Sequence, residues 1–264
     1  ELGFCLYQGA LCRTVGIFIE EVTQRFYQDA LLNYIEQTDE FKRSDVANAL
    51  ESFMQKSCIY TITRLPIIER SQILNDDENN CFKFFKNCFI HITKDETSQH
   101  SYDQIPKDKY VQLSKVRQRD FKPQQTGLYL DFLTKATDWD KQCENISTII
   151  GYLSHEFKDE TTGYIIVLTE QCPDPKDGGG SGKNLFCNLF SNTTTYCSKN
   201  GKQVKYDEKF FQSWGGQRIM GISDVPANFD FEFLKEPSTG TFILKKLFKN
   251  EVEIPVEDGP KFMV

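Results

Sequence analysis

The sequence has few of the residues that build turns, and few imidazoles. Among its 264 residues are 16 Gly, nine Pro and three His. With so few histidines, a hydrolase that relies on a His base has few candidates for that role. The apolar runs all stop well short of the roughly 18 residues that a transmembrane helix needs, so we expect no membrane span.

The charge balance argues against one class of partner. Lys and Arg number 31 against 38 Asp and Glu, which gives a net charge of -7. Binding driven by phosphate contacts needs clustered Lys and Arg, so we do not expect a protein that binds mainly nucleic acid. Hydrophobic residues make up 39% of the chain and charged residues 26%, which is typical of a globular chain. The 22 Phe residues predict an aromatic core.

Nine cysteines are present, but none forms a CxxC pair. This weakens zinc-finger and thioredoxin-like interpretations. The number is odd, so a complete set of disulfides would leave one thiol over. Most of the cysteines stand beside apolar residues, and we predict buried free thiols. We expect no cofactor and no metal site.

The alternative is an oxidised, glycosylated chain. Of two glycosylation sequons, at Asn145 and Asn192, the second is the better candidate, because the first lies inside a predicted helix. The chain opens at Glu1 rather than Met, so we expect that any targeting signal has been removed. We favour an intracellular location, cytoplasmic or nuclear, over a secreted one. In a secreted protein, the candidate disulfide cysteines are Cys172, Cys187 and Cys197.

Helical periodicity is clearest in two segments. Apolar residues recur every three or four positions over Thr14–Gln37 and over Asp138–Phe157, which predicts two amphipathic helices. Asp138 suits the capping position of the second helix. Another helix is expected to begin at Ser44 or Asp45, ahead of a strand-like run at Cys58–Thr63.

The segments between these helices are less regular. Asn75–Asn80 predicts a solvated loop, and so does the polar segment Thr93–Pro106. The intervening run Phe82–Ile92 fits a helix or a strand equally well.

The second half of the chain predicts strands. Tyr164–Leu168 is continuously apolar, as in a strand buried on both faces. Asn200-Gly201 suits a type I′ turn in a hairpin, and the alternation at Phe229–Phe233 suits a half-exposed strand. Later strands are expected at Thr241–Phe248 and Glu251–Val256, after a turn at Pro237–Gly240.

These elements predict an α+β fold, in which a helix-rich N-terminal half packs on a mainly antiparallel sheet formed largely by the C-terminal half. We expect one domain over residues 1–264, or a helical part over 1–125 and a β-rich part over 126–264. The stretch GGGSG at 178–182 has the composition of a flexible linker and is either natural or introduced by engineering.

Each candidate motif has a simpler structural interpretation. GGGSGK invites comparison with a phosphate-binding loop, but Asp177 replaces its first Gly and Asn184 its Ser or Thr. The DxD pair at 138–140 lies at a helix start, where the helix dipole favours Asp. Ser154 and His155 are helix neighbours that do not face each other, so they form no dyad. A Cys nucleophile paired with one of the histidines stays open, and no catalytic residue is assigned.

The one basic stretch runs from Lys107 to Lys122, where six bases outnumber two acids. We predict a solvated face or a strip that docks a partner protein, with nucleic acid as a weaker alternative. The basic residues are Lys107, Lys109, Lys115, Arg117, Arg119 and Lys122.

The sequence therefore favours a non-catalytic protein-interaction domain, a subunit or adaptor of a eukaryotic protein assembly. The alternative is a secreted or cell-surface glycoprotein that binds a receptor or ligand, and a cysteine-dependent hydrolase is the third candidate. The first choice follows from the lack of an intact catalytic motif and from the many aromatic residues on predicted sheet edges.

Overall fold

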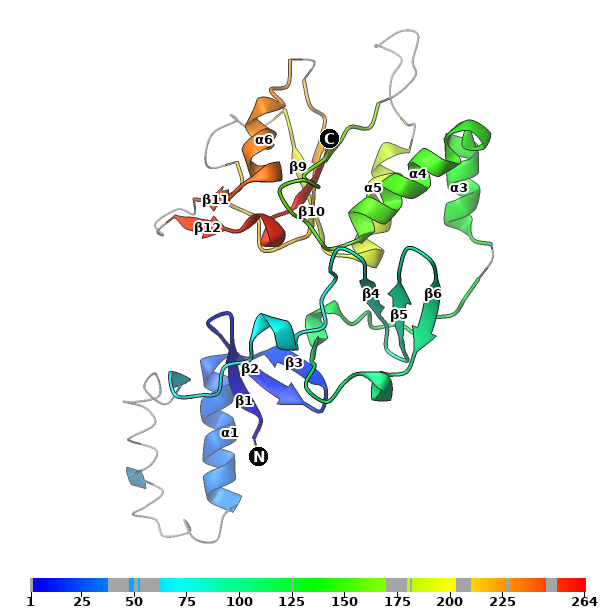
Figure 1. Ribbon diagram of the computed structural model, residues 1–264. Coiled ribbons are helices and arrows are strands. Elements are labelled where there is room, and N and C mark those ends of the chain that lie inside the picture. Colours follow the sequence, from blue (N-terminus) through cyan, green and yellow to red (C-terminus); the bar gives the residue numbers. More distant parts are fainter. Residues whose placement is uncertain are drawn as a thin grey trace. The chain divides into compact units, whose positions relative to one another are not determined.

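Figure 1 shows a computed structural model of the chain. The structure describes residues 2–37, 48–49, 52, 62–124, 126–169, 180, 182–202, 210–226, 228–245 and 251–264. Contacts divide the chain into two compact units. Unit 1 is Glu1–Asn75 with Phe82–Phe121, and unit 2 is Asp76–Cys81 with Lys122–Val264.

The first sheet of unit 1 is an antiparallel three-stranded meander with one short parallel strand added at its edge. Helix α1 (Gln24–Gln37) packs against this meander, where the rings of Phe4 and Tyr27 meet edge to face with centroids 4.8 Å apart. The strands are β1 (Phe4–Tyr7), β2 (Ala10–Val15), β3 (Phe18–Glu21) and β7 (Val111–Gln112).

The helix predicted for Thr14–Gln37 is wrong over its first part. Gly16, with a φ of 60°, lies in the turn that joins β2 to β3, and helix α1 begins only at Gln24. Val15 and Phe18, whose spacing looked helical, are partners across this hairpin. Glycine adopts positive φ at little cost, so Gly16 allows a tight turn between two strands where the spacing predicts a helix.

A second sheet of unit 1 has the strand order β4-β5-β6, with β4 at Cys81–Phe84, β5 at Phe89–Ile92 and β6 at Thr97–His100. The run Phe82–Ile92 is therefore two strands. The loop predicted for Thr93–Pro106 is wrong where β6 lies, because a polar edge strand needs only backbone pairing with its neighbour. Short 3-10 helices occupy Arg70–Gln72, Tyr102–Gln104, Leu113–Lys115 and Val256–Asp258.

Unit 2 is built on a four-stranded sheet with the order β8-β13-β10-β9, in which every neighbouring pair is parallel. Its helices are α3 (Leu128–Ala136), α4 (Trp139–Ser154), α5 (Lys183–Thr193) and α6 (Glu232–Thr239). The strands are β8 (Ile165–Ile166), β9 (Tyr196–Asn200), β10 (Ile219–Ser223) and β13 (Lys261–Met263), and a separate antiparallel ribbon pairs β11 (Phe242–Leu244) with β12 (Val252–Ile254).

Side chains of this sheet alternate between two apolar layers, as a pleated strand requires. Ile219 and Met263 are buried with residues of α4 and α5. Met220 and Phe262 are buried in an aromatic layer that includes residues of α6 and β11. Figure 1 shows α4 and α5 side by side and α6 on the other side of the sheet.

The predicted arrangement of the two halves is wrong. The described residues combine helices with strands, but strands fill the N-terminal half and the helices are scattered along the chain. The C-terminal sheet is parallel rather than antiparallel. Strand direction depends on the connections that cross a sheet, and the alternation of apolar residues within a strand does not specify it.

The second strand of the hairpin predicted at Asn200-Gly201 lies mostly outside the described residues, so that hairpin stays a prediction. Two other local predictions in unit 2 are wrong. Tyr164–Leu168 contains a strand, β8, as predicted, but β8 is an edge strand and Tyr164 is 62% exposed, so the segment is not buried on both faces. The strand predicted for Phe229–Phe233 gives way to α6, which begins at Glu232 and contains Pro237 of the predicted turn.

Other predictions agree with the structure. Helix α4 occupies most of Asp138–Phe157, and β11 and β12 lie within the last two predicted strands. The predicted helix start at Ser44 or Asp45 and most of the run Cys58–Thr63 lie outside the described residues, as does most of the GGGSG stretch. Within the described ranges, no helix has both the length and the apolar character needed to cross a bilayer.

Candidate functional site

The segment Asp76–Cys81 packs on the C-terminal end of α4 within unit 2. The backbone N–H of Glu156 donates to Oδ2 of Asp76 over 2.7 Å, and Nε2 of His155 lies 3.2 Å from the backbone oxygen of Asn80. His155 is the first residue after α4, and its N–H still donates to Gly151. Two segments about 75 residues apart are thus joined by two hydrogen bonds, both donated from the end of α4.

This junction gathers three different metal-binding side chains. One donor atom each of Asp76, Cys81 and His155 lies within 4.8 Å of the other two. Cys81 is buried, while Asp76 and His155 are half-buried. A thiolate, an imidazole and a carboxylate are the groups that bind zinc in proteins. They are also the groups of a Cys–His–Asp nucleophilic triad.

The hydrogen bond of His155 decides which ring nitrogen carries its lone pair. A backbone carbonyl only accepts, so Nε2 must hold the proton that it donates to Asn80. In the neutral ring, Nδ1 is then the acceptor, available to a metal ion or to a thiol proton. A carbonyl that fixes the tautomer in this way is the usual outer partner of a metal-bound histidine.

Asp77 shapes the loop that presents the Asn80 carbonyl. Its Oδ1 accepts from the backbone N–H groups of Asn79 and Asn80, each over 2.9 Å. Burial raises the pKa of the Asp77 carboxyl, but these hydrogen bonds and the charge of His155 outweigh it, and the pKa lies below its usual value. The loop is therefore held by an ionised carboxylate at neutral pH.

Lys261 also holds the backbone of His155 in place. Its ammonium donates to the carbonyl oxygens of Tyr152 and His155 over 2.7 and 2.6 Å, and it lies 4.2 Å from the centroid of the Tyr152 ring. Lys261 is the first residue of β13. The end of α4, and with it the His155 ring, is thus tied to the central sheet.

A second charged cluster lies beside this site. Lys158 is 1% exposed and donates to the carbonyl oxygens of Pro237 and Pro260. Burial and the neighbouring Arg218 lower the pKa of Lys158 to about 8. Arg218 in turn donates to the Glu257 carbonyl over 2.8 Å. These cations cross-link loops at the amino ends of parallel strands, whereas open α/β sheets bind ligands at the carboxyl ends, so we assign them a structural role.

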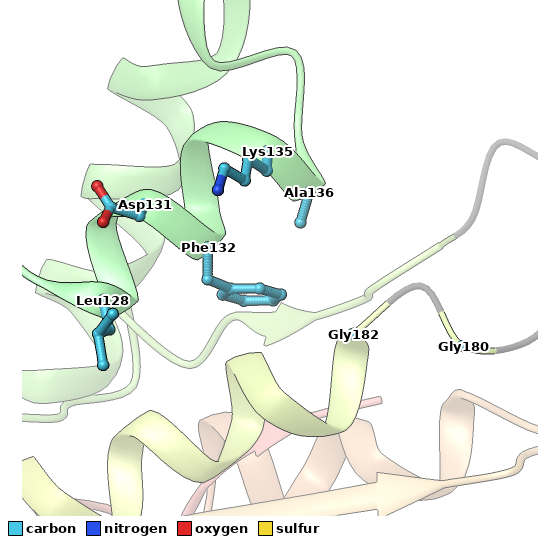
Figure 2. A pocket seen from close by; sticks show the side chains of 7 residues that line it. All are labelled: Leu128, Asp131, Phe132, Lys135, Ala136, Gly180 and Gly182. Carbon is cyan, nitrogen blue, oxygen red and sulfur yellow. The ribbon is translucent and has the colours of Figure 1, made fainter.

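A hollow of about 520 Å³ lies along α3. Figure 2 shows Leu128, Phe132 and Ala136 on this helix, with the Phe132 ring directed toward Gly182 at the start of α5. Asp131 and Lys135 stand on the same helix beside the apolar residues. Leu128 is 89% exposed. The hollow therefore offers an apolar surface with one charge of each sign next to it.

The basic strip is only partly available at the surface. Lys109 donates to the Ser71 carbonyl over 2.5 Å and Lys115 to Oδ1 of Asn75 over 3.0 Å, so both hold a neighbouring segment of unit 1. Arg119 lies over the Phe85 ring at 5.9 Å. Lys107 and Lys122 are exposed, and Arg117 is half-buried. The docking role of the strip stays a prediction.

The cysteines and the sequon named for a secreted protein lie in unit 2. Asn192 is near the end of α5. Cys187 donates weakly to Sδ of Met263 and Cys197 to the Ile219 carbonyl, and burial raises the pKa of both thiols. Cys172 lies outside the described residues. Glycosylation and disulfides here stay predictions.

The other two histidines are placed apart from the cluster. His91 stacks on Phe82 with ring centroids 4.7 Å apart, and His100 is hydrogen-bonded to Ser98 and Gln104. Asp138 of the DxD pair stands at the cap of α4, but its carboxylate pairs with Lys141 rather than with a backbone N–H.

The sequence interpretation missed the Asp76–Cys81–His155 cluster. The sequence predicts a solvated loop around Asp76, and no short spacing links that loop to His155. No local signal points to His155, because the pattern predicts that it lies inside the helix Asp138–Phe157, whereas α4 ends at Ser154. A comparison with models of known protein families and with curated proteins found no match.

Proposed function

We propose that this protein is a non-catalytic binding domain, an adaptor or subunit of a protein assembly, whose C-terminal unit holds a transition-metal ion at Asp76, Cys81 and His155. The observation that carries the proposal is the mutual approach of three unlike donor atoms to within 4.8 Å. These three side chains supply three of the four ligands that a tetrahedral zinc site takes.

The donor set favours zinc over the hard cations. Mg²⁺ and Ca²⁺ take oxygen ligands almost exclusively, and Cys81 offers sulfur. Zinc accepts sulfur, nitrogen and oxygen together, and the tautomer that the Asn80 carbonyl imposes leaves Nδ1 of His155 as the ligand. Asp76 is oriented by the N–H of Glu156. Each of these two ligands is therefore positioned by the backbone of the segment it faces.

A structural role for the ion follows from what it joins. The ion would close a loop of about 75 residues between Cys81 and His155. Closing a long loop removes chain entropy from the unfolded state, so metal binding and folding are coupled. Cys81 is 9% exposed, and a metal ligand can be this buried in the folded chain.

Cobalt(II) titration of the chelator-treated full chain tests the proposal. We expect one Co²⁺ per chain, visible d–d bands of a tetrahedral site, and a near-ultraviolet thiolate-to-cobalt band that zinc abolishes. Cys81→Ser should remove the thiolate band, and His155→Gln should weaken binding about tenfold or more. Cys197→Ser is the matched control, because Cys197 lies outside the cluster, and it should retain both bands.

Two results would overturn the metal proposal. One is a thiolate band that survives Cys81→Ser. The other is a chain that binds no cobalt and whose Cys81 is instead labelled fast by an electrophilic probe in a His155-dependent manner. That second result would favour the cysteine-dependent hydrolase, which uses the same three side chains.

A specific observation also supports a partner surface on unit 2. The apolar residues Leu128, Phe132 and Ala136 follow one another at four-residue spacing along the hollow of α3 (Figure 2). Leu128 at 89% exposure is more open than the other large apolar residues of the described chain. We propose that this face contacts an apolar segment of a protein partner, which the adjacent Asp131 and Lys135 orient through charge.

Chemical cross-linking in a native extract tests the partner surface. A protein cross-linked to the wild-type chain should be lost with Leu128→Glu. It should persist with Ile67→Glu, which places the same charge at a residue of unit 1 that is 66% exposed. Equal loss with both variants, or none with either, would count against the α3 face.

The state of the cysteines supports an intracellular setting. Seven cysteines in the described part of the chain are free thiols, and reducing compartments keep thiols in that form. The alternative, a secreted glycoprotein, predicts an intact mass raised by a glycan at Asn192. A thiol count and an intact mass on protein from its native source separate the two.

A further inference from the structure

The hairpin of β1 and β2 places two cysteines directly opposite each other. In the antiparallel register, Cys5 pairs with Cys12. The two-residue turn at Gln8 and Gly9, with φ values of 47° and 76°, has positive φ at both positions. Such turns match the twist of the flanking strands and fix the register of a hairpin. The pairing of the cysteines is therefore set by local geometry.

Both thiols point to the same face of the sheet, because directly opposite residues share a face. Each is 3% exposed, and both belong to one apolar cluster with Ile19 and Ile68. Burial raises the pKa of Cys5 to about 11, and the nearby thiol of Cys12 contributes to that rise. Both thiols therefore lie in the same apolar layer of unit 1.

The hydrogen-bond pattern gives the separation of the two backbones. The N–H of Thr14 donates to the carbonyl of Gly3 over 2.8 Å, so Gly3 and Thr14 form a hydrogen-bonded pair. Hydrogen-bonded pairs recur at every second residue, which makes Cys5 and Cys12 the next one. The Cα atoms of such pairs are about 5.5 Å apart. A disulfide allows about 4.4 to 6.8 Å between Cα atoms, but its Cβ atoms are about 3.5 to 4.5 Å apart. Opposite Cβ atoms in a sheet are about 4.5 to 5.5 Å apart, with hydrogen-bonded pairs at the wider end, so the two strands must move closer together as the bond forms.

We propose that Cys5 and Cys12 are a redox-active pair, which a low-molecular-weight disulfide oxidises to an intramolecular disulfide. This inference concerns unit 1 and goes beyond the proposed metal site in unit 2. Among the strand pairs of the described residues, no other places two cysteines directly opposite each other.

The reaction balances as two exchange steps. The thiolate of one cysteine attacks a sulfur of glutathione disulfide, which forms a mixed disulfide and releases one glutathione thiolate. The thiolate of the other cysteine then attacks the protein sulfur of that mixed disulfide and releases the second glutathione. The two thiol protons pass to the two glutathione thiolates. The protein loses two hydrogen atoms, and one glutathione disulfide becomes two glutathione thiols.

The bond would secure a strand that already joins two segments. On its other edge, β1 is bonded to the chain around residue 67, through Leu6 N–H to the Pro66 carbonyl and Ile68 N–H to the Leu6 carbonyl, each over 2.8 Å. Oxidation would join β1 covalently to β2 through Cys5, the residue next to Leu6, and Cys12. Opening of the hairpin, which exposes both thiols to the oxidant, would then be suppressed.

Equilibration of the full chain with glutathione tests the pair. Chelator-treated protein is incubated at a series of ratios of glutathione disulfide to glutathione, in one arm folded and in the other refolded from denaturant. Free thiols are trapped by alkylation and mapped by peptide mass spectrometry. We expect the peptide with both Cys5 and Cys12 alkylated to fall about tenfold across the series, replaced by a Cys5–Cys12 disulfide, while Cys88 stays alkylated.

The refolding arm separates two reasons why the disulfide could fail to form. If the oxidant reaches the buried thiols too slowly, the disulfide forms only in the refolding arm. If the bond does not fit the hairpin, the disulfide forms in neither arm. Cys12→Ser should leave Cys5 alkylated or bound to glutathione, whereas Cys88→Ser, the change of an equally buried cysteine, should leave the Cys5–Cys12 disulfide in place. Full alkylation of both cysteines in both arms would overturn the inference. A disulfide from either one to another cysteine would overturn it as well. None of these results depends on whether unit 2 binds a metal.

Discussion

The backbone N–H of Glu156 donates a 2.7 Å hydrogen bond to the carboxylate of Asp76, 80 positions earlier in the chain. This bond orients Asp76 toward Cys81 and His155, and it also holds the segment Asp76–Cys81 on unit 2. One contact therefore serves both the stability of the unit and the geometry of the candidate metal site. Two substitutions of Asp76 separate those contributions.

Asp76→Ala removes the acceptor and should lower the free energy of unfolding by about 1–2 kcal/mol in the presence of a chelator. Asp76→Asn keeps an acceptor oxygen and should cost less. Both should weaken cobalt binding, since both remove the carboxylate. Urea denaturation and cobalt titration measure the two effects, and Asp95→Ala, at an exposed position, is the control. Equal stability of Asp76→Ala and wild type would contradict the role of the bond.

Gly221→Ala should strongly destabilise unit 2. Gly221 lies in β10, and a Cβ there would overlap the hydroxyl of Tyr196 on the neighbouring strand. Overpacking of this kind costs about 1–3 kcal/mol. Tyr196→Phe removes the nearest obstructing atom but keeps the ring carbon Cζ, which would lie 2.9 Å from the added Cβ, so the double variant should recover part of the loss. Thermal and urea unfolding of the two single variants and the double variant form the cycle, and additive losses would rule out the clash.

Gly151→Ala should have the opposite effect. Gly151 lies inside α4 and is exposed, and a methyl group added there would meet no atom within 4 Å beyond the helix's own backbone. Alanine is favoured over glycine in helices by about 0.5–1 kcal/mol. An increase of that size in the free energy of unfolding is expected in urea. A decrease in the free energy of unfolding would contradict this expectation, because it would mean that another part of the folded chain contacts α4 at Gly151.

The buried Lys158 should make stability depend on alkaline pH. Its pKa is about 8 in the folded chain and about 10.4 in an unfolded one. Between these values the unfolded chain holds a proton that the folded chain has lost, so stability rises with pH in that window and is independent of this group below it. Urea unfolding at several pH values should give wild type a more positive slope than Lys158→Met, by at most about 1.4 kcal/mol per pH unit.

The matched control for this pH series is Lys94→Met, at an exposed lysine. It should follow the slope of wild type, because an exposed lysine is in contact with water in both the folded and the unfolded chain. A Lys158→Met slope equal to that of wild type would mean that Lys158 stays protonated in the folded chain up to its ordinary pKa.

The sequence by itself determined the elements whose pattern is strong over many residues. Helix α4 follows from apolar residues at helical spacing over four turns, and β11 and β12 follow from short alternating runs between turns. The hairpin of β2 and β3 did not follow, because Val15 and Phe18 fit a helix as well as a strand pair. Only the positive φ at Gly16 separates the two.

The tertiary structure alone decided strand direction and the composition of the site. The sheet of unit 2 is parallel because the chain crosses it between successive strands, and no residue within β8 or β9 records that path. The candidate site depends on the same kind of long-range information. Asp76 lies in the segment Asn75–Asn80, which the sequence predicts to be a solvated loop, and Cys81 follows this segment directly. His155 lies at the end of a helix some 75 residues later. Local sequence specifies local backbone preferences, whereas the approach of distant segments depends on which apolar faces pack together.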